Sequence, residues 1–211
     1  MRLVDAAQAL DVSTMTLRRD LAESETGFDL LGGYIVPRNL PAYTLEVEQG
    51  SHVQAKIDAG RRAAALVRPG DTIFADCGTT MPHLIAALPA DLEVTIVCYA
   101  LNVAASASRL GRAQLFLLGG LFHPTSATFY SEEALRSLNQ LGINKAFLSA
   151  GGVHETQGAS CSHFHEVPVK RAVLERAVES FLVVDSSKLG QVKPAFFSPL
   201  SVFAAVLTEV G

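Results

Sequence analysis

The sequence predicts an α/β protein in which a mostly parallel sheet is covered by helices on both faces, preceded by a small helical segment. From residue 53 onward, short apolar runs alternate with longer stretches that have helical periodicity. The apolar runs are continuous, which is typical of parallel strands buried on both faces. The chain has 211 residues, 49% of them hydrophobic and 18% charged, so it can bury one substantial core.

Residues 1–36 form the first predicted domain. Residues 2–10 place their apolar side chains on one helical face. Ser13 is a good N-cap for a second helix over residues 14–21 or slightly beyond. The following DLLGGYIV predicts two short strands around a tight turn at Gly32-Gly33. Two helices followed by a hairpin are typical of a winged helix-turn-helix.

The second helix carries a candidate DNA-reading surface. Leu17 and Leu21 are four residues apart and point inward, which leaves Thr14, Met15, Arg18 and Arg19 on the outer face. The first 38 residues hold four Arg against six Asp and Glu, a net charge of −2. This is a poor electrostatic footprint for contacts with DNA phosphates. The residues alone therefore leave open whether the helix reads DNA or is an ordinary solvated surface.

The remaining chain divides into a linker and the main domain. Residues 37–52 contain two prolines and no clear period, and they predict a linker. The main domain spans residues 53–211. We expect its strands at 72–76, 94–99, 114–119, 146–150, 180–185 and 202–207, and its helices at 53–67, 80–88, 101–109, 131–141 and 166–179.

The turn after the first strand of the main domain is the most informative candidate site. Asp76 ends the strand, and Gly78, Thr79 and Thr80 lead into a helix. Unpaired amides and the positive end of the helix dipole can hold an anion at such a turn. A carboxylate beside it suits polyol hydroxyls. The pattern therefore points to a phosphorylated sugar.

Small and polar residues follow the other strands too. Ligands of open parallel sheets bind at the carboxyl ends of the strands, and a helix starting at Glu166 can reach the same edge. For any single glycine, an ordinary turn is an equally good interpretation. The complete candidate set is Asp76, Gly78, Thr79, Thr80, Asn102, Gly120, Glu166, Lys170, Asp185 and Lys188.

Several classes of protein are disfavoured by the rest of the sequence. The apolar runs are far shorter than the ~20 residues of a membrane helix, and no signal peptide precedes them, so we expect no membrane partner. Three scattered cysteines without a CxxC pair favour a reduced, cytoplasmic compartment. His163 and His165 lie near Cys161 but lack a third fixed ligand. We therefore expect solvated loop histidines, no metal and no cofactor.

Nine short runs are spread over nearly the whole chain: VSTMTLRRDL (12–21), LLGGYIV (30–36), DCGTT (76–80), VCYALN (97–102), LGGLFH (118–123), SAGGVH (149–154), GASC (158–161), EVPVK (166–170) and VVDSSKLG (183–190). Together they resemble the DeoR family of bacterial transcriptional regulators. The LLGGYIV, VCYALN and GASC runs are more specific than the family-wide RRDL and GTT signatures.

The resemblance implies a winged helix-turn-helix followed by a sensor domain resembling ribose-5-phosphate isomerase. The ligand-free protein would bind operator DNA and repress nucleoside catabolism genes, and deoxyribose 5-phosphate would release it. By position, the resemblance assigns the strand-end set to the effector pocket. We expect a homo-oligomer from the symmetry usual for helix-turn-helix proteins. The operator contacts implied by position are Ser13, Thr14, Thr16, Arg18 and Arg19.

The chain departs from the family pattern at four places. It begins almost inside the family's second helix, and it stops at Gly211, short of the usual tail. Asp11 replaces a turn glycine, which is tolerable because Asp adopts left-handed backbone more readily than most residues. Asn144 stands where relatives carry Asp. Without the first helix, we expect the chain to sense its ligand but to bind DNA less well.

Two other functions compete with a repressor. A sugar-phosphate isomerase or lyase would use Glu166 as general base, with Asp76 and Lys170 orienting the substrate. A plainer alternative is a domain whose glycines are turns and whose partner is another protein. An isomerase has no use for residues 1–36, so the repressor is favoured and the isomerase is kept as the alternative.

Overall fold

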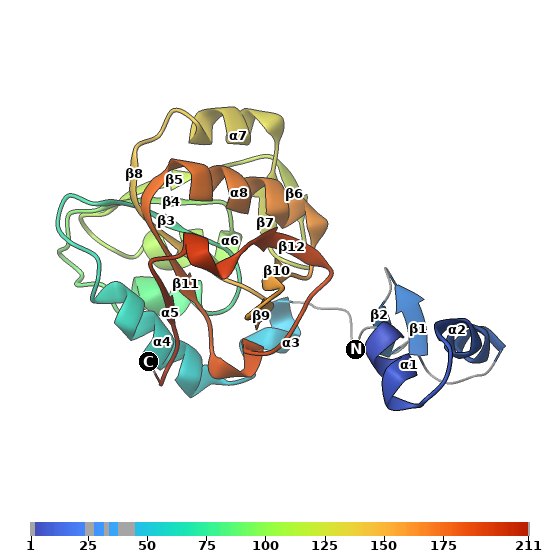
Figure 1. Cartoon of the computed structure of the whole chain (residues 1–211). Helices are drawn as coiled ribbons and strands as arrows, with labels where there is room; N and C mark the ends of the chain where they lie inside the picture. The colour runs from blue at the N-terminus through green and yellow to red at the C-terminus, as the bar shows by residue number, and fades with distance from the viewer. Residues whose placement is uncertain (1–2, 24–27, 32–33, 38–44, 211) are drawn as a thin grey trace. The chain divides into compact units, whose positions relative to one another are not determined.

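The computed structural model describes residues 3–23, 28–31, 34–37 and 45–210. The chain divides into two compact units, Met1–Ala42 and Tyr43–Gly211 (Figure 1).

The first unit contains the two helices and the hairpin predicted from residues 1–36. Helices α1 (Leu3–Ala9) and α2 (Thr14–Glu23) precede strands β1 (Phe28–Leu31) and β2 (Tyr34–Pro37), which pair antiparallel. The turn predicted at Gly32-Gly33 lies outside the described residues. A small apolar core joins both helices to both strands. It consists of buried Leu3, Ala6, Ala7 and Leu17, with Leu21, Leu30 and Ile35 packed against them.

The turn between α1 and α2 shows how the sequence ends one helix and starts the next. Asp11 has a φ of 52°, in the left-handed region that Asp tolerates better than most residues. The Val12 amide then donates to the Ala7 carbonyl at 3.0 Å. Ser13 Oγ accepts a hydrogen bond from the Thr16 amide at 3.0 Å. Ser13 therefore caps α2 as predicted, satisfying one of the donors that a helix start leaves unpaired.

Six parallel strands form the central sheet of the second unit, in the order β13-β11-β8-β3-β4-β5. Each lies in or beside a predicted strand, so the fold class is confirmed. Three starts differ: β8 starts before residue 146, β11 starts inside the helix predicted over 166–179, and β13 starts after residue 202. The bounds are β3 (Thr72–Ala75), β4 (Thr95–Cys98), β5 (Gln114–Leu117), β8 (Ile143–Leu148), β11 (Ala177–Val183) and β13 (Ala205–Leu207).

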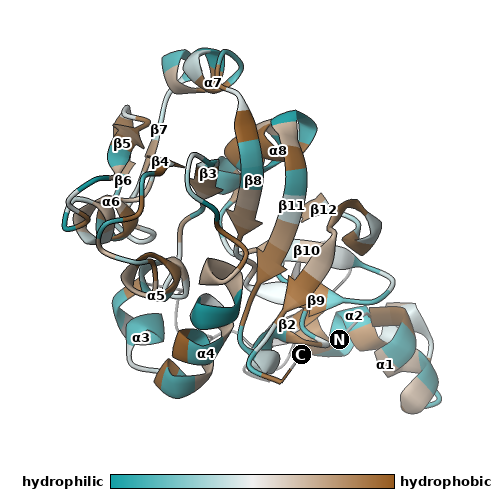
Figure 2. Ribbon diagram, turned by 90° about the vertical axis from the view of Figure 1, so that its left-hand side faces the viewer, coloured by the Kyte–Doolittle hydropathy of each residue, from teal (hydrophilic) through white to brown (hydrophobic). Residues whose placement is uncertain are grey.

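Five helices cover the sheet, all in intervals where the sequence predicts them. Helices α4 (Val53–Ala64), α5 (Met81–Ala86) and α6 (Leu101–Ala107) lie on one face, and α7 (Glu132–Leu138) and α8 (Val167–Arg176) lie on the other (Figure 2). The inner strands are apolar on both faces because both are covered, whereas the residues of the edge strand β5 are exposed. Among the described residues, no helix is long and apolar enough to span a membrane.

Three features were not predicted from the sequence. Strands β9 (Gly152–His154), β10 (Gly158–Cys161) and β12 (Ala195–Ser198) form a second, antiparallel sheet, and β6 (Leu121–His123) pairs with β7 (Thr128–Tyr130). Helix α3 (Leu45–Gln49) lies within the stretch predicted to be a linker. That part of the linker prediction is wrong. The helix is fixed by tertiary contacts, including a hydrogen bond from the Leu45 amide to the Thr125 carbonyl at 2.9 Å, which periodicity does not reveal.

Candidate ligand-binding site

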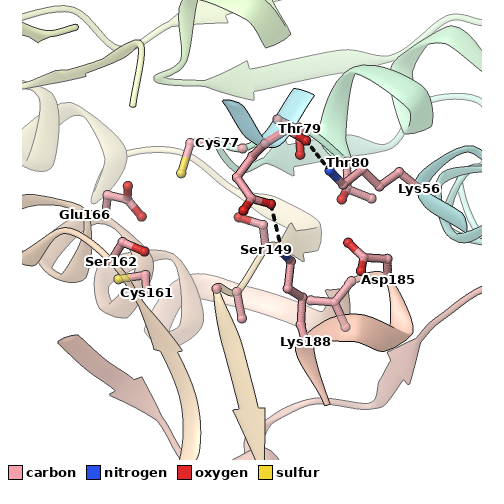
Figure 3. Close-up of a pocket in the computed structure, with 15 residues that line it drawn as sticks. Lys56, Cys77, Thr79, Thr80, Ser149, Cys161, Ser162, Glu166, Asp185 and Lys188 are labelled. Carbon is pink, nitrogen blue, oxygen red and sulfur yellow. Dashed lines mark hydrogen bonds and ion pairs between the residues drawn. The ribbon is translucent and has the colours of Figure 1, made fainter. Parts of the chain in front are cut away.

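The candidate site lies where the order of the sheet reverses direction. Neighbouring strands β3 and β8 are followed by connections that lead to opposite sides, to β4 and to β11. Ligands of open α/β sheets bind outside the carboxyl ends of the strands at such a switch point. A cavity of about 40 Å³ lies here (Figure 3). It is lined by Glu48, Lys56, Cys77, Gly78, Thr79, Thr80, Ser149, Ala150, Gly151, Cys161, Ser162, Glu166, Val184, Asp185 and Lys188.

The turn after β3 forms one wall of this cavity. Gly78 has a φ of 91°, a backbone conformation that residues other than glycine rarely adopt. Its carbonyl accepts a hydrogen bond from Asn102 Nδ2 at 2.9 Å, which fixes the turn. Among the described residues, the amides of Gly78, Thr79 and Thr80 have no acceptor. The wall therefore presents backbone donors that a ligand can use.

A buried ion pair lies directly beneath the cavity. Asp76 and Lys170 are both fully buried, and the Lys170 ammonium donates to Asp76 Oδ2. The same carboxylate accepts from the Tyr99 hydroxyl at 2.9 Å and from the Ser149 amide at 2.7 Å. Burial alone would lower the pKa of Lys170, but the charge of Asp76 together with those of the other nearby acidic groups outweighs burial and raises that pKa well above its usual value. These two residues therefore support the site from behind and do not line it.

Glu166 lines the cavity on the side opposite Lys56 (Figure 3). Its carboxylate is 3.8 Å from the Lys170 ammonium, one helical turn further along α8. Burial raises the pKa of Glu166, Lys170 opposes the rise and Asp76 adds to it. Because Asp76 and Lys170 are paired with each other and closed to solvent, they are not presented to a substrate. The geometry therefore does not assemble the three-residue arrangement that an isomerase would use.

Two lysines form the basic side of the cavity. The Lys188 ammonium is 2.8 Å from Glu48 Oε2. Lys56 is almost fully buried, and its ammonium donates to the carbonyls of Glu48 and Ser51 at 2.6 and 2.8 Å. Burial lowers the pKa of Lys56. The negative charges of Asp185 and Glu48 oppose this effect, but the pKa remains below its usual value. The basic side is therefore held mainly by carbonyls and carboxylates of the chain itself.

Asp185 offers the clearest unfilled hydrogen-bonding position. The residue is 1% exposed and follows β11. Its Oδ1 accepts from the Ser187 amide and hydroxyl. Among the described residues, Oδ2 has no hydrogen-bond partner although it is buried. A buried carboxylate oxygen without a donor is costly, so this atom is suited to a hydroxyl group of a bound ligand.

The structure brings most of the predicted set together. Gly78, Thr79, Thr80, Glu166, Asp185 and Lys188 line the cavity. Asp76, Lys170 and Asn102 lie behind it and hold its walls. Gly120 is the exception: a Cβ there would lie 2.3 Å from the Tyr130 carbonyl, so this glycine permits close packing against β7.

Sequence reasoning missed four charged or hydroxyl-bearing side chains of the lining. Ser149 and Ser162 follow β8 and β10, and attention to hydroxyls after those strands could have found them. Glu48 and Lys56 carry no comparable signal. They come from α3 and α4, and only the fold brings them to the edge of the sheet.

The prediction of solvated loop histidines is wrong. The ring centroids of His165 and His123 lie 3.8 Å apart and those of His165 and His163 lie 5.2 Å apart, with the rings stacked. His165 Nε2 also contacts the hydroxyls of Ser126 and Thr128, at 3.1 and 3.3 Å. The hairpin β6–β7, absent from the sequence prediction, supplies these partners. Within the described residues, no group of three or more potential metal ligands is found.

In the first unit, the residues predicted to contact DNA lie together at α2. Ser13, Thr14, Arg18 and Arg19 are exposed, and Thr16 is half-buried through its contacts with Ser13. Arg19 Nε lies 3.9 Å from Asp20, so part of its charge is offset.

The fold and the site together define a ligand-sensing domain joined to a helix-turn-helix unit, and known families match both parts. Residues 1–37 match the DeoR-like helix-turn-helix domain, and residues 51–210 match the DeoR C terminal sensor domain. The chain therefore belongs to the DeoR family, as a transcriptional repressor.

Named relatives agree with this assignment. The chain is 41% identical over 211 residues to the deoxyribose operon repressor of Escherichia coli K12, covering 99% of this chain and 84% of that protein. It is 31% identical over 216 residues to the lactose phosphotransferase system repressor of Streptococcus mutans, covering 99% and 85%.

One solved structure shares the fold of much of this chain. The β subunit of eIF2B from Chaetomium thermophilum matches with a TM-score of 0.54 and 16% identity, covering 75% of this chain and 49% of that one. A ribose 5-phosphate isomerase A from Methanocaldococcus jannaschii matches with a TM-score of 0.49 and 20% identity, covering 66% and 55%. The chain spans about half the length of these solved structures.

Proposed function

We propose that this repressor controls deoxyribonucleoside catabolism genes and leaves its operator when a sugar phosphate, deoxyribose 5-phosphate, binds the cavity at the switch point. The observation that carries the proposal is the composition of this cavity. Within the described part of the chain, it combines two lysines with backbone amides that have no acceptor and with the buried Asp185 Oδ2, which has no hydrogen-bond partner. The name of the E. coli relative, deoxyribose operon repressor, supports the choice of sugar.

The proposed ligand orientation follows from the two sides of the cavity. Its phosphate would lie beside Lys188 and the amides of residues 78–80, which supply charge-assisted hydrogen bonds. Its hydroxyls would donate to Asp185 Oδ2 and reach Glu166 and Ser162. The cavity of about 40 Å³ is far smaller than the ~300 Å³ of a small ligand site, so binding requires the walls to open.

The DNA side of the proposal rests on α2. Its exposed polar face would enter the major groove, as the second helix of a helix-turn-helix does. We also propose that the chain acts as a homo-oligomer in the cytoplasm, because paired half-sites are read by symmetric proteins. The sheet edge at β5 supports association, since Leu115, Phe116 and Leu117 are all exposed there.

A thermal-shift panel tests the effector. Deoxyribose 5-phosphate at about 100 times its dissociation constant stabilises a folded protein by about 2.7 kcal/mol, which raises the Tm of a chain of this size by roughly 5–10 °C. Ribose 5-phosphate, glucose 6-phosphate and unphosphorylated deoxyribose serve as comparisons. A larger shift with deoxyribose 5-phosphate than with these is the expected result. An unchanged Tm with every sugar phosphate would contradict the proposal.

A further inference from the structure

We propose that Glu48 is a built-in competitor of the effector: its carboxylate occupies the anion position beside Lys188, and an arriving phosphate displaces it together with helix α3. This inference rests on the proposed function, because it requires a sugar phosphate to bind this cavity. It adds a route by which effector binding changes the structure outside the cavity.

The position of the Glu48 carboxylate is the first observation. Oε2 is 2.8 Å from the Lys188 ammonium, and both side chains are largely shielded from solvent, with exposed fractions of 27% and 18%. Glu48 lines the same cavity as Gly78, Thr79 and Thr80. Burial alone would raise the pKa of Glu48, but the hydrogen bond and charge of Lys188, aided by Lys56 and Lys193, lower it overall. The carboxylate is therefore ionised at neutral pH and acts as an internal anion.

The cavity does not accommodate both anions as it stands. Its volume of about 40 Å³ holds no more than a few water molecules, whereas a pentose phosphate is several times larger. A phosphate dianion beside Lys188 would also repel an ionised Glu48 in a region of low dielectric. Binding the effector through Lys188 therefore requires the Glu48 carboxylate to leave.

Helix α3 depends on the same basic side of the cavity. It has only five residues, too few for an isolated helix to be stable in water. The Lys56 ammonium binds the Glu48 carbonyl, which lies near the helix end, and Lys188 binds the Glu48 side chain. A phosphate that draws either ammonium toward itself weakens the attachment of α3 as well.

The place of α3 in the chain gives this displacement a consequence. It is the first described element of the second unit, so the chain leading from the helix-turn-helix unit enters the sensor through it. An effector that binds one arrangement of α3 better than the other shifts the population between them. Because such coupling is reciprocal, whatever stabilises the attached α3 must weaken effector binding by the same factor.

Isothermal titration of the full chain with deoxyribose 5-phosphate tests the inference. Glu48→Gln keeps the shape of the side chain but removes its charge, whereas Glu46→Gln makes the same change on the exposed side of α3. We expect Glu48→Gln to bind the effector about five-fold more tightly or better, and Glu46→Gln to match the wild type. Hydrogen exchange of residues 45–49 should become faster when the wild type is saturated with the effector.

The outcomes separate this inference from the proposed function. If the wild type binds deoxyribose 5-phosphate but Glu48→Gln binds it equally or less tightly, the competitor role is overturned and the effector site stands. Effector binding with unchanged or slower exchange at residues 45–49 overturns the displacement of α3 in the same way. If the wild type binds no sugar phosphate, the proposed function and this inference both fall.

Discussion

Lys170 on α8 and Asp76 after β3 form an ion pair that is closed to solvent, although 94 positions separate them in the sequence. The pair also binds Ser149, which directly follows β8, through the amide and carbonyl of that residue. It therefore joins the two strands of the switch point to the helix that carries Glu166. The Asp76–Lys170 pair therefore supports the cavity from below.

Replacing Lys170 by Met is expected to destabilise the protein by about 3–5 kcal/mol, because Asp76 would be left as an uncompensated buried charge. Urea unfolding measures the change. Arg136→Ala removes one partner of an exposed ion pair on α7 and should have little effect, which makes it the matched control. A Lys170→Met variant as stable as the wild type would show that the pair does not support the site.

Asp185→Asn is expected to weaken binding of deoxyribose 5-phosphate about tenfold or more, because a hydrogen bond to a charged acceptor contributes about 1.5–3 kcal/mol. The amide oxygen can still accept from Ser187, so the local turn is kept. Titration calorimetry measures the affinity, with Glu155→Gln in the exposed β9–β10 turn as control. Equal affinities in the variant and the wild type would remove Asp185 from the proposed site.

Arg18→Ala is expected to weaken binding to promoter DNA of deoxyribonucleoside catabolism genes while effector affinity stays unchanged. If Arg18 contacts a phosphate, the salt dependence of DNA binding should fall by about one unit in the logarithmic slope. Gel-shift titrations at several salt concentrations measure both quantities, and Arg61→Ala on α4 is the control. Unaltered DNA binding by Arg18→Ala would exclude this residue from the interface.

The stacked histidines predict a pH dependence of stability. Burial, followed by the charges of His123 and His163, lowers the pKa of His165 from 6.5 to about 4. Between these pH values the unfolded chain binds more protons than the folded chain. The free energy of unfolding therefore rises as the pH increases across this window and decreases as the pH falls through it.

His165→Gln should flatten this part of the profile by up to one proton, which unfolding at several pH values measures. His154→Gln at the end of β9 serves as the control. A profile for His165→Gln that runs parallel to the wild type between pH 4 and 6.5 would contradict the expectation.

The sequence predicts the central sheet well because continuous apolar runs report burial on both faces. The strands Thr72–Ala75 and Thr95–Cys98 both lie within ranges predicted from such apolar runs. The second sheet escapes it, since strands such as Gly152–His154 and Gly158–Cys161 are short and begin with glycine. Short strands of this kind are stabilised by the sheet that they join and not by their own propensity.

The same distinction holds for the site. The turn at Gly78 can be predicted from the sequence because a glycine and two hydroxyl residues follow an apolar strand and precede a helix. Lys56 is invisible, because an ordinary helical lysine becomes buried only through the carbonyls of Glu48 and Ser51. The burial of Asp76 was equally hidden, since its partner Lys170 is distant in sequence.

The ion pair beneath the cavity separates what stabilises the fold from what faces the ligand. Asp76 and Lys170 stabilise the fold from one layer below the residues that line the cavity. Side chains such as Ser162 and Glu166 therefore can be exchanged at smaller cost to folding than their central location suggests. For the design of biosensors, this makes the lining the place to redirect the repressor toward another metabolite while its scaffold is left intact.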